Sequence, residues 1–563
     1  MRADDWIVDF LVRHGVTDIF GIPGVVVMDF LYAFDKRKPE ITPHLTYHEQ
    51  GGAFAACGYA QATGKLGVAY STRGPGLTNM VTAIADAYYD SIPTMFITAH
   101  SSVNVNAEMR VLNNQEIDTV SIVQSVTKKA VRIDYIEELQ QEVILAYKEA
   151  VSGRKGPVFL DIYNGLFSKD VDASFDQCMD AFSEVDDLHE MVSDVESRIS
   201  RAKRPVFLIG NGARSEKCKE YLVSIAEKFS IPVLSSRGAQ DIVPFMDKYY
   251  GFVGSRATRY SNFILSKADL ILAVGNRMAF PVNSKSFWPI VEKAFTIRID
   301  IDNGEFNREI PNSVIYNFEA ECALEKLENA NLEYLGCDDW INTCNILKKH
   351  LDKWDEDLVV KAVEDIISKT TEKMPLVVDV GNHSFWITTA HAYLHANNRI
   401  LYSGSFGTLG SALPKSIGAY YSTREPVVCF TGDQGIQFNI QELQLISLEK
   451  LPITVVIVNN TSSGMIMERE IAKYGKYLVH TTMDSGYSFP NFEKVAHCYG
   501  LEYKRIDVNA NNKDMELDFL KPSIIELMVD KDTELKPSLP VGSVCQDLHP
   551  ELPRELYKYL NSL

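Results

Sequence analysis

The residues best suited to chemistry lie in the C-terminal third of the chain, where polar side chains follow two apolar runs. The run PVVCFT leads into the turn GDQG at 432–435, and PITVVIV leads into Asn459 and Asn460. Neighbouring parallel strands end at one edge of a sheet, so Asp433 and Asn460 would offer the hard oxygen ligands that Mg²⁺ prefers. Gly435 and the next helix start would offer backbone N–H groups to a phosphate. Either turn alone also fits an ordinary strand-to-loop junction, but the spacing and the strand context together favour a site.

These turns need a scaffold, and the chain supplies short apolar runs that alternate with helical patterns. Runs such as GPVFLDIY (156–163), DLILAVGNR (269–277) and PLVVDVGN (375–382) are continuously apolar, as strands buried on both faces are. Helical patterns, for example at 81–90 and 221–230, fill the gaps. The alternation predicts an α/β protein of three doubly wound parallel-sheet domains with right-handed crossovers.

Two segments resemble linkers: 168–190 is acidic and lacks sustained periodicity, and 321–340 leads through a charged helix into 348–358. Cutting the chain there predicts domains at 1–167, 190–330 and 355–530, followed by a proline-containing C-terminal tail at 531–563.

The composition narrows the class of protein. Apolar residues make up 46% and charged residues 23% of the 563, a mixture that can bury several cores. The formal charge of −19 argues against non-specific binding to nucleic acid or to an anionic membrane. Nine scattered cysteines without a CxxC pair favour a reduced compartment. The N-terminus lacks a signal-peptide core and no run reaches membrane-spanning length, so a cytoplasmic protein is expected.

The order of motifs along nearly the whole chain resembles the thiamine diphosphate-dependent enzymes, specifically the acetolactate synthase-like family. That family carries a GDG turn followed by NN in its diphosphate-binding domain, and an HEQGA-type stretch in its pyrimidine-binding domain, matched here by HEQGG at 48–52. Further similar stretches are GYAQATGKLGV (58–68), STRGPGLTNMVTAIADAYYDSIP (71–93), NNQEIDTVSIVQSVTKK (113–129), VDVGNHSFW (378–386) and SGSFGTLGSALPKSIGA (403–419). The resemblance implies a pyrimidine-binding, a central and a diphosphate-binding domain, in that order.

The resemblance also implies roles for single residues. Glu49 would hydrogen-bond the aminopyrimidine ring of thiamine diphosphate and promote removal of the C2 proton, and Gln115 would lie near the thiazolium ring. Mg²⁺ would be bound by Asp433, Asn460 and the carbonyl of Ser462. Further implied cofactor contacts are Asn382 and His383 at the diphosphate, the Gly407 carbonyl at the aminopyrimidine, Leu409 as apolar support of the bent cofactor, and Gly432, Gln434, Gly435 and Met465. For Leu409 an ordinary core position is the alternative.

Several positions depart from the family pattern. Gln434 stands where the family has Gly, but backbone N–H donation survives this change. Val25 stands where simple 2-oxo acid decarboxylases have Asp, and His100 is single where those enzymes have a His pair. Because release of an aldehyde needs positioned acids, both positions favour carboligation. Arg469 stands where acetolactate synthases usually have Trp, and it either pairs with an anionic acceptor or is a solvated surface residue.

These patterns predict a thiamine diphosphate- and Mg²⁺-dependent carboligase that decarboxylates pyruvate, or another 2-oxo acid, and transfers the acyl unit to an acceptor carbonyl. The hypothesis for the acceptor is a phosphorylated or nucleotide-linked keto sugar. Acetolactate synthase proper, a 2-oxo acid decarboxylase or lyase, and an inactive regulatory subunit remain alternatives. FAD stays open, because NRMAFPVNS (276–284) replaces the family's flavin-site run. The family's cofactor bridges two subunits, so a homodimer or homotetramer is expected.

Overall fold

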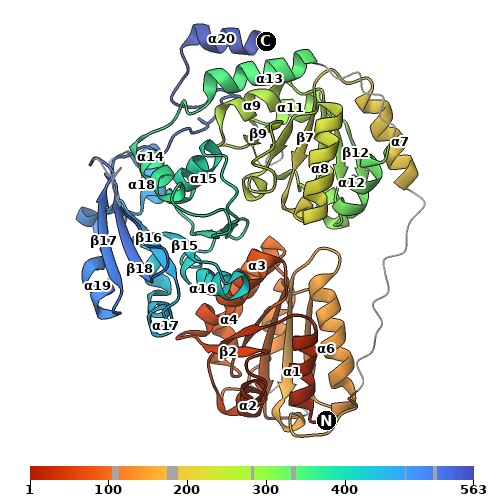
Figure 1. Ribbon diagram of the computed structural model, residues 1–563, viewed down its shortest axis with the longest axis vertical. Coiled ribbons are helices and arrows are strands. Elements are labelled where there is room, and N and C mark those ends of the chain that lie inside the picture. The colour runs from red at the N-terminus through yellow and green to blue at the C-terminus, as the bar shows by residue number, and fades with distance from the viewer. Residues whose placement is uncertain (104–112, 174–187, 280–283, 331–337, 476, 511–515) are drawn as a thin grey trace. The chain divides into compact units, whose positions relative to one another are not determined.

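The computed structural model describes residues 1–103, 113–173, 188–279, 284–330, 338–475, 477–510 and 516–563 (Figure 1). Its strands form three six-stranded sheets whose strand pairs are all parallel. The chain divides into two compact units, the first built from residues 1–179, 370–384 and 398–533 and the second from 180–369, 385–397 and 534–563. The predicted class, three α/β domains with doubly wound parallel sheets, is confirmed.

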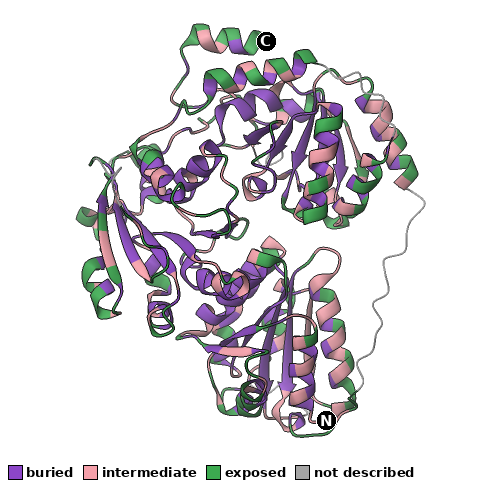
Figure 2. Cartoon of the chain, in the orientation of Figure 1, coloured by how far each residue is buried: buried purple, intermediate pink, exposed green. Residues whose placement is uncertain are grey.

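The first sheet has the strand order β2-β1-β3-β4-β6-β5. Its strands are β1 (Asp18–Gly21), β2 (Thr42–Leu45), β3 (Gly67–Tyr70), β4 (Thr94–His100), β5 (Lys129–Ile133) and β6 (Pro157–Tyr163). The accompanying helices are α1 (Ala3–Arg13), α2 (Met28–Lys36), α3 (Glu49–Thr63), α4 (Pro75–Asp90), α5 (Thr119–Val123) and α6 (Ile136–Val151). Figure 2 shows the strands largely buried and the outer helix faces exposed, as expected for parallel strands covered on both sides.

The other sheet of the same unit has the order β14-β13-β15-β16-β18-β17. If β13 is counted as the first strand, this order becomes 2-1-3-4-6-5, which is the order of the first sheet. The first and last domains therefore share one layout. Its strands are β13 (Leu376–Val378), β14 (Ile400–Tyr402), β15 (Val427–Gly432), β16 (Ile453–Asn459), β17 (Glu502–Asp507) and β18 (Ser523–Met528). Its helices are α16 (Ala412–Thr423), α17 (Leu443–Leu448), α18 (Gly464–Tyr474) and α19 (Phe492–Cys498), while α15 (His383–Tyr393) begins in this unit and continues in the second.

The second unit contains the central sheet, with the order β12-β11-β10-β7-β8-β9. This is the order found in dinucleotide-binding sheets. Its strands are β7 (Pro205–Ile209), β8 (Val233–Ser235), β9 (Tyr249–Phe252), β10 (Leu270–Val274), β11 (Phe295–Ile299) and β12 (Ser313–Tyr316). Its helices are α7 (Leu188–Ile199), α8 (Glu216–Phe229), α9 (Arg259–Lys267), α11 (Trp288–Lys293), α12 (Ala320–Glu328), α13 (Asp338–Leu351), α14 (Leu358–Ile367) and α20 (Arg554–Ser562).

The segments between domains were harder to predict. Most of the predicted linker at 168–190, and part of that at 321–340, lies outside the described residues. The predicted C-terminal tail ends in the helix α20, whose Leu560 is buried in an apolar cluster with Phe263 of the second unit. Among the described residues, no helix has the length and apolar character needed to span a bilayer.

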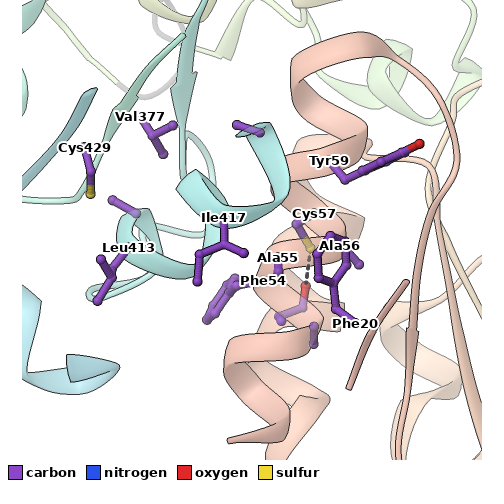
Figure 3. Packing of buried hydrophobic residues seen from close by; sticks show 14 of the residues in the cluster. Phe20, Phe54, Ala55, Ala56, Cys57, Tyr59, Val377, Leu413, Ile417 and Cys429 are labelled. Atoms are coloured by element: carbon purple, nitrogen blue, oxygen red, sulfur yellow. Dashed lines mark hydrogen bonds between the residues drawn. The ribbon is translucent and has the colours of Figure 1, made fainter. Parts of the chain in front are cut away.

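Helices α3 and α16 join the first and last domains inside one continuous core. Helix α3 has few charges and is buried nearly all round, as its apolar sequence after Gln50 requires. Figure 3 shows Phe54 of α3 and Ile417 of α16 in this core. A Cβ atom at Gly58 would collide with the carbonyl oxygen of Lys415, and one at Gly418 with that of Ala55. The two helices therefore cross with their backbones in contact.

Candidate active site

The polar turns after β15 and β16 lie side by side, as predicted. Gly432 pairs with Val458 across the two strands, so Asp433 and Asn459 leave the sheet at the same edge. The Asn459 side chain points into the sheet, where its Nδ2 donates to Glu526 Oε1 at 2.6 Å and its Oδ1 accepts from Thr461 N at 3.0 Å. Of the two asparagines, this leaves Asn460 as the one able to face a ligand.

Four buried polar atoms around these turns have no hydrogen-bond partner among the described residues. They are Asn382 Oδ1, His383 Nε2, Asp433 Oδ2 and Ser462 Oγ. Buried polar groups are nearly always paired in folded proteins, so a cluster of unpaired ones marks a place where a polar ligand fits. The described residues hold no group of three or more His, Cys, Asp or Glu side chains suited to a metal. An ion here would therefore rely on one carboxylate together with amide and carbonyl oxygens, as Mg²⁺ does.

We call the residues Asn382, His383, Asp433, Asn460 and Ser462 the cradle. Glycines hold its polar groups close together. A Cβ at Gly464, the first residue of α18, would lie 2.6 Å from Asn460 Nδ2 and 3.2 Å from Asn382 Nδ2. A Cβ at Gly432 would lie 3.4 Å from His383 Nδ1. A side chain at Gly464 would therefore displace Asn460, a predicted ligand, whereas one at Gly432 would make only ordinary contact with His383.

Burial sets the charge state of the cradle in the absence of a ligand. It raises the pKa of Asp433 to about 7, although the Tyr487 hydroxyl and the Gln434 amide act in the opposite direction. Burial also lowers the pKa of His383 to about 4, so its imidazole is neutral at pH 7. A buried carboxyl with a raised pKa gains most from a bound cation, because the cation favours the ionised form.

Glu49 begins α3, and local sequence explains why the helix starts there. His48 is extended and caps the helix, since its Nδ1 accepts a hydrogen bond from Gln50 N at 3.1 Å. A carboxylate in the first turn is also favoured by the helix dipole. The Glu49 side chain is half-buried and its Oε2 accepts a hydrogen bond from Asn79 Nδ2 of α4 at 2.9 Å. Asn79 lies in the family-like stretch 71–93, but nothing in the sequence indicated that it hydrogen-bonds Glu49.

The predicted cofactor-support loop follows β14 and precedes α16. Gly407 is exposed with φ +74°, and Leu409 is 37% exposed although it is apolar. A core position for Leu409 is therefore wrong, and its exposure fits an apolar surface kept open for a ligand. The next residue, Gly410, is fixed from both sides: its N–H donates to Asp379, and its carbonyl accepts from Asn439 Nδ2 at 2.8 Å.

Gln115 lies on an exposed turn with φ +60°, an uncommon conformation for a residue other than glycine. It packs so closely on Gly74 that a Cβ there would collide with the Gln115 carbonyl. The neighbouring Glu116 is buried and accepts hydrogen bonds from the N–H groups of Ser101 and Ser102, at 2.9 and 2.8 Å. Burial opposes ionisation, but these hydrogen bonds hold the pKa of Glu116 below its ordinary value. Glu116 therefore anchors the turn that presents Gln115.

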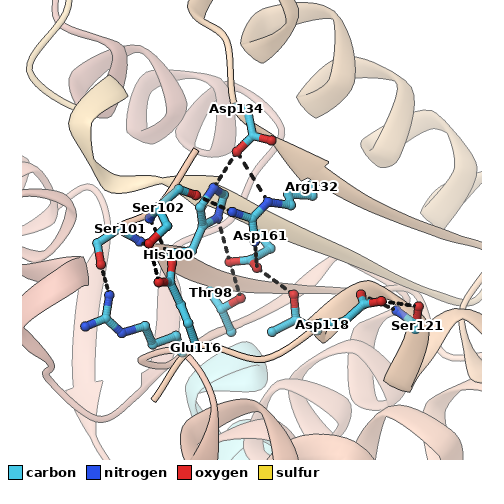
Figure 4. Close-up of polar contacts among 12 residues, drawn as sticks. Thr98, His100, Ser101, Ser102, Glu116, Asp118, Ser121, Arg132, Asp134 and Asp161 are labelled. Atoms are coloured by element: carbon cyan, nitrogen blue, oxygen red, sulfur yellow. Dashed lines mark hydrogen bonds and ion pairs between the residues drawn. The ribbon is translucent and has the colours of Figure 1, made fainter. Parts of the chain in front are cut away.

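His100 does not face solvent. Its ring lies at the end of β4 between two carboxylates, with Nε2 2.8 Å from Asp134 Oδ1 and Nδ1 3.2 Å from Asp161 Oδ1 (Figure 4). Thr98 Oγ1 also donates to Asp161 at 3.0 Å. Only 1% of the His100 side chain is exposed, so the structure gives it no direct route to a substrate.

The predicted positions Val25, Met465 and Arg469 differ in exposure. Val25 is 82% exposed, and Met465 is half-buried in the first turn of α18. Arg469, also on α18, is exposed and forms no ion pair with any described residue. The preceding Glu468 accepts a hydrogen bond from Asn382 Nδ2 at 2.7 Å, which links α18 to the cradle. Glu468 was not singled out in the sequence, although it directly precedes Arg469.

Comparisons with known proteins agree with this geometry. Residues 1–149 match the family described as thiamine pyrophosphate enzyme, N-terminal TPP binding domain; residues 192–327 match its central domain, and residues 379–521 its C-terminal TPP binding domain. The acetolactate synthase isozyme 1 large subunit of Escherichia coli is 30% identical over 563 residues, covering 96% of each chain. The large subunit from Lactococcus lactis is 29% identical, covering 94% of this chain and 93% of its own.

Proposed function

The chain belongs to the thiamine pyrophosphate-dependent enzymes of the acetolactate synthase family, and we propose that it joins the acyl unit of a 2-oxo acid to an acceptor other than pyruvate. Pyruvate is the proposed donor. The observation that carries this proposal is Arg469, an exposed cation without an ion-pair partner among the described residues, beside the Glu468 that contacts the cradle. A guanidinium there suits a phosphate or carboxylate on the acceptor, as in a phosphorylated or nucleotide-linked keto sugar.

The proposed residue roles rest on the family resemblance, and the unpaired atoms of Asp433, Asn382 and His383 support them. Asp433, Asn460 and the Ser462 carbonyl would hold Mg²⁺, while Asn382 and His383 would contact the diphosphate. When bound, thiamine diphosphate supplies the carbon nucleophile that the protein's side chains lack. Glu49 would hold a proton at the aminopyrimidine ring, with Asn79 fixing the orientation of its carboxylate. Leu409 would shape the apolar surface beneath the cofactor, and Gln115 would lie near its thiazolium ring.

The test is a product analysis. The protein is incubated with thiamine diphosphate, Mg²⁺ and pyruvate, alone and with a panel of keto acids, aldehydes and keto sugars, and products are identified by mass. A condensation product that requires an anionic acceptor supports the proposal. Efficient acetolactate formation from pyruvate alone would contradict it and favour acetolactate synthase proper. Acetaldehyde release without any acceptor would instead favour a decarboxylase.

Variants of Arg469 sharpen this test. Arg469→Ala should weaken use of an anionic acceptor while leaving donor decarboxylation intact, because it removes only the proposed acceptor contact. Lys473→Ala serves as the matched control, since Lys473 is an exposed cation one turn further along α18. Equal effects of the two substitutions would remove the support for an Arg469 role.

Two further features belong to the proposal. We propose a homodimer or homotetramer on the basis of the family resemblance, and the mass of the native particle tests it. Binding of FAD by the central domain is open to a direct test, because a flavin absorbance spectrum of the purified protein decides it. The strand order of the central sheet suits a dinucleotide, but part of the stretch 276–284 lies outside the described residues.

A further inference from the structure

Glu442 is a buried carboxyl that the proposed mechanism does not use. It ends a short 3-10 helix, Ile440–Glu442, nine residues after Asp433, and none of its side chain is exposed. No Lys, Arg or His among the described residues forms an ion pair with it. Carboxylates are rarely buried without a cationic partner, so its hydrogen bonds must account for its position.

Those hydrogen bonds reach the turn that carries Glu49. Both oxygens of Glu442 accept from the backbone N–H of Tyr47, at 3.1 and 3.2 Å. On the other side of the turn, a Cβ at Gly51 would collide with Oε1 of Glu442. The carboxylate therefore fills the space that a side chain at position 51 would occupy, and it contacts the start of α3 both before and after Glu49.

A second contact from the same segment supports the turn. Asn439, buried at 1% exposure, donates from Nδ2 to Gln50 Oε1 at 3.3 Å and to the Gly410 carbonyl at 2.8 Å. The segment 439–442 thus touches both the turn with Glu49 and the loop with Leu409. Both places are proposed cofactor contacts, the turn at a pyrimidine ring and the loop at a bend, and in the proposed homodimer they serve different cofactor molecules.

Opposing influences act on the ionisation of Glu442. Burial raises its pKa to about 7, while the amide groups of Tyr47 and His48 favour the ionised form. An ionised carboxylate can accept hydrogen bonds with both oxygens, whereas the neutral acid loses one acceptor to its own proton.

We propose that Glu442 is a positioning residue for Glu49, holding the first turn of α3 so that the Glu49 carboxylate stands in register with the aminopyrimidine ring. This inference rests on the proposed function of Glu49. A displacement of about 1 Å in such a group can cost about 100-fold in rate, so a side chain that touches no cofactor can still control the proton transfer.

The first experiment needs no cofactor. Backbone amide exchange is measured by mass spectrometry on the full-length protein and on Glu442→Gln. The amide replacement keeps the size of the side chain but places an NH₂ group where one acceptor stood. Exchange at residues 47–51 should become faster in this variant, while the rest of α3 keeps its protection. Unchanged exchange at 47–51 would overturn the proposal.

The second experiment measures the proton that Glu49 is proposed to control. The C2 proton of bound thiamine diphosphate exchanges with deuterated water, and its rate is read by acid quench and NMR. Glu442→Gln should slow this exchange about 10- to 100-fold, with the cofactor dissociation constant changed less than about threefold. An exchange rate like that of the unaltered protein would also overturn the proposal.

Controls separate this inference from the function it rests on. Glu449→Gln is the matched control, because Glu449 also reaches from the last domain to the first, but to His44 rather than to the start of α3. It should leave C2 exchange unchanged. Glu442→Asp, if Glu442→Gln fails to fold, should give a smaller slowing. If Glu49→Gln itself leaves C2 exchange unchanged, the proposed role of Glu49 fails, whatever Glu442 does.

Discussion

Lys415 of α16 and Asp86 of α4 form a fully buried ion pair, with Nζ and Oδ2 2.6 Å apart although 329 residues separate them in sequence. Burial disfavours the ammonium, but the charge of Asp86 outweighs it and raises the pKa of Lys415 above its ordinary value. The pair lies beside the crossing of α3 and α16, where Gly58 faces the Lys415 carbonyl. It therefore joins the first and last domains within their shared core.

Lys415→Met should destabilise this unit strongly, because it leaves Asp86 buried and charged without a partner. The expected loss is about 3–5 kcal/mol, seen as a lower urea midpoint for the unfolding transition of the first unit. The double variant Lys415→Met/Asp86→Leu should recover much of the loss. A single variant as stable as the unaltered protein would show that the pair contributes nothing to the interface.

Glu49→Gln should lower turnover about 10²- to 10⁴-fold, the usual contribution of a positioned acid or base. Thiamine diphosphate binding, followed by fluorescence quenching, should change much less. Asn79→Ala removes only the hydrogen bond to Glu49 Oε2, so a loss of about tenfold is expected. Turnover by Glu49→Gln equal to that of the unaltered protein would refute the assigned role.

Removal of Mg²⁺ should release the cofactor. Dialysis against EDTA should weaken thiamine diphosphate binding about 100-fold, and so should Asp433→Ala at a fixed Mg²⁺ concentration, both measured by calorimetry. Asp518→Asn, at an exposed surface aspartate, is the control. Mg²⁺-dependent binding that survives Asp433→Ala would place the ion elsewhere.

His44 should make stability depend on pH. Burial disfavours its imidazolium, but hydrogen bonds to Asp18 and Glu449 outweigh this and raise the pKa of His44 above 6.5. Burial alone would raise the pKa of Glu449, but the hydrogen bonds from His44 and Tyr421 outweigh it and lower this pKa. The stability that protonated His44 adds is full below about pH 6.5 and is lost as pH rises through its folded-state pKa.

His44→Gln should therefore cost most near pH 5.5, where both charges are present, and progressively less at higher pH. Thermal unfolding of both proteins across pH 5 to 9 measures the difference. The stability that ionised Glu449 adds is present above its ordinary pKa of 4.5 and is lost as pH falls through its lower folded-state pKa. A stability difference that grew with rising pH would contradict the assignment.

Much of the site could be predicted because its residues follow strands. Asp433 and Asn460 come directly after apolar runs, and the parallel sheet brings such positions to one edge. Glu442, Asn439 and Asn79 could not be found in this way. Their importance lies in contacts with residues far away in sequence, and no local spacing reveals those contacts. The partners of His100 could not be found either, since Asp134 and Asp161 surround it only in the folded domain.

The glycine crossing of α3 and α16 has a consequence for how this enzyme can evolve. Gly58 and Gly418 each leave room only for a carbonyl group of the opposite helix, so the main chain alone sets the interval between the two rods. Substitutions at other positions along either helix can then accumulate without altering that interval. The spacing of the first and last domains would therefore stay constant among relatives whose other side chains differ.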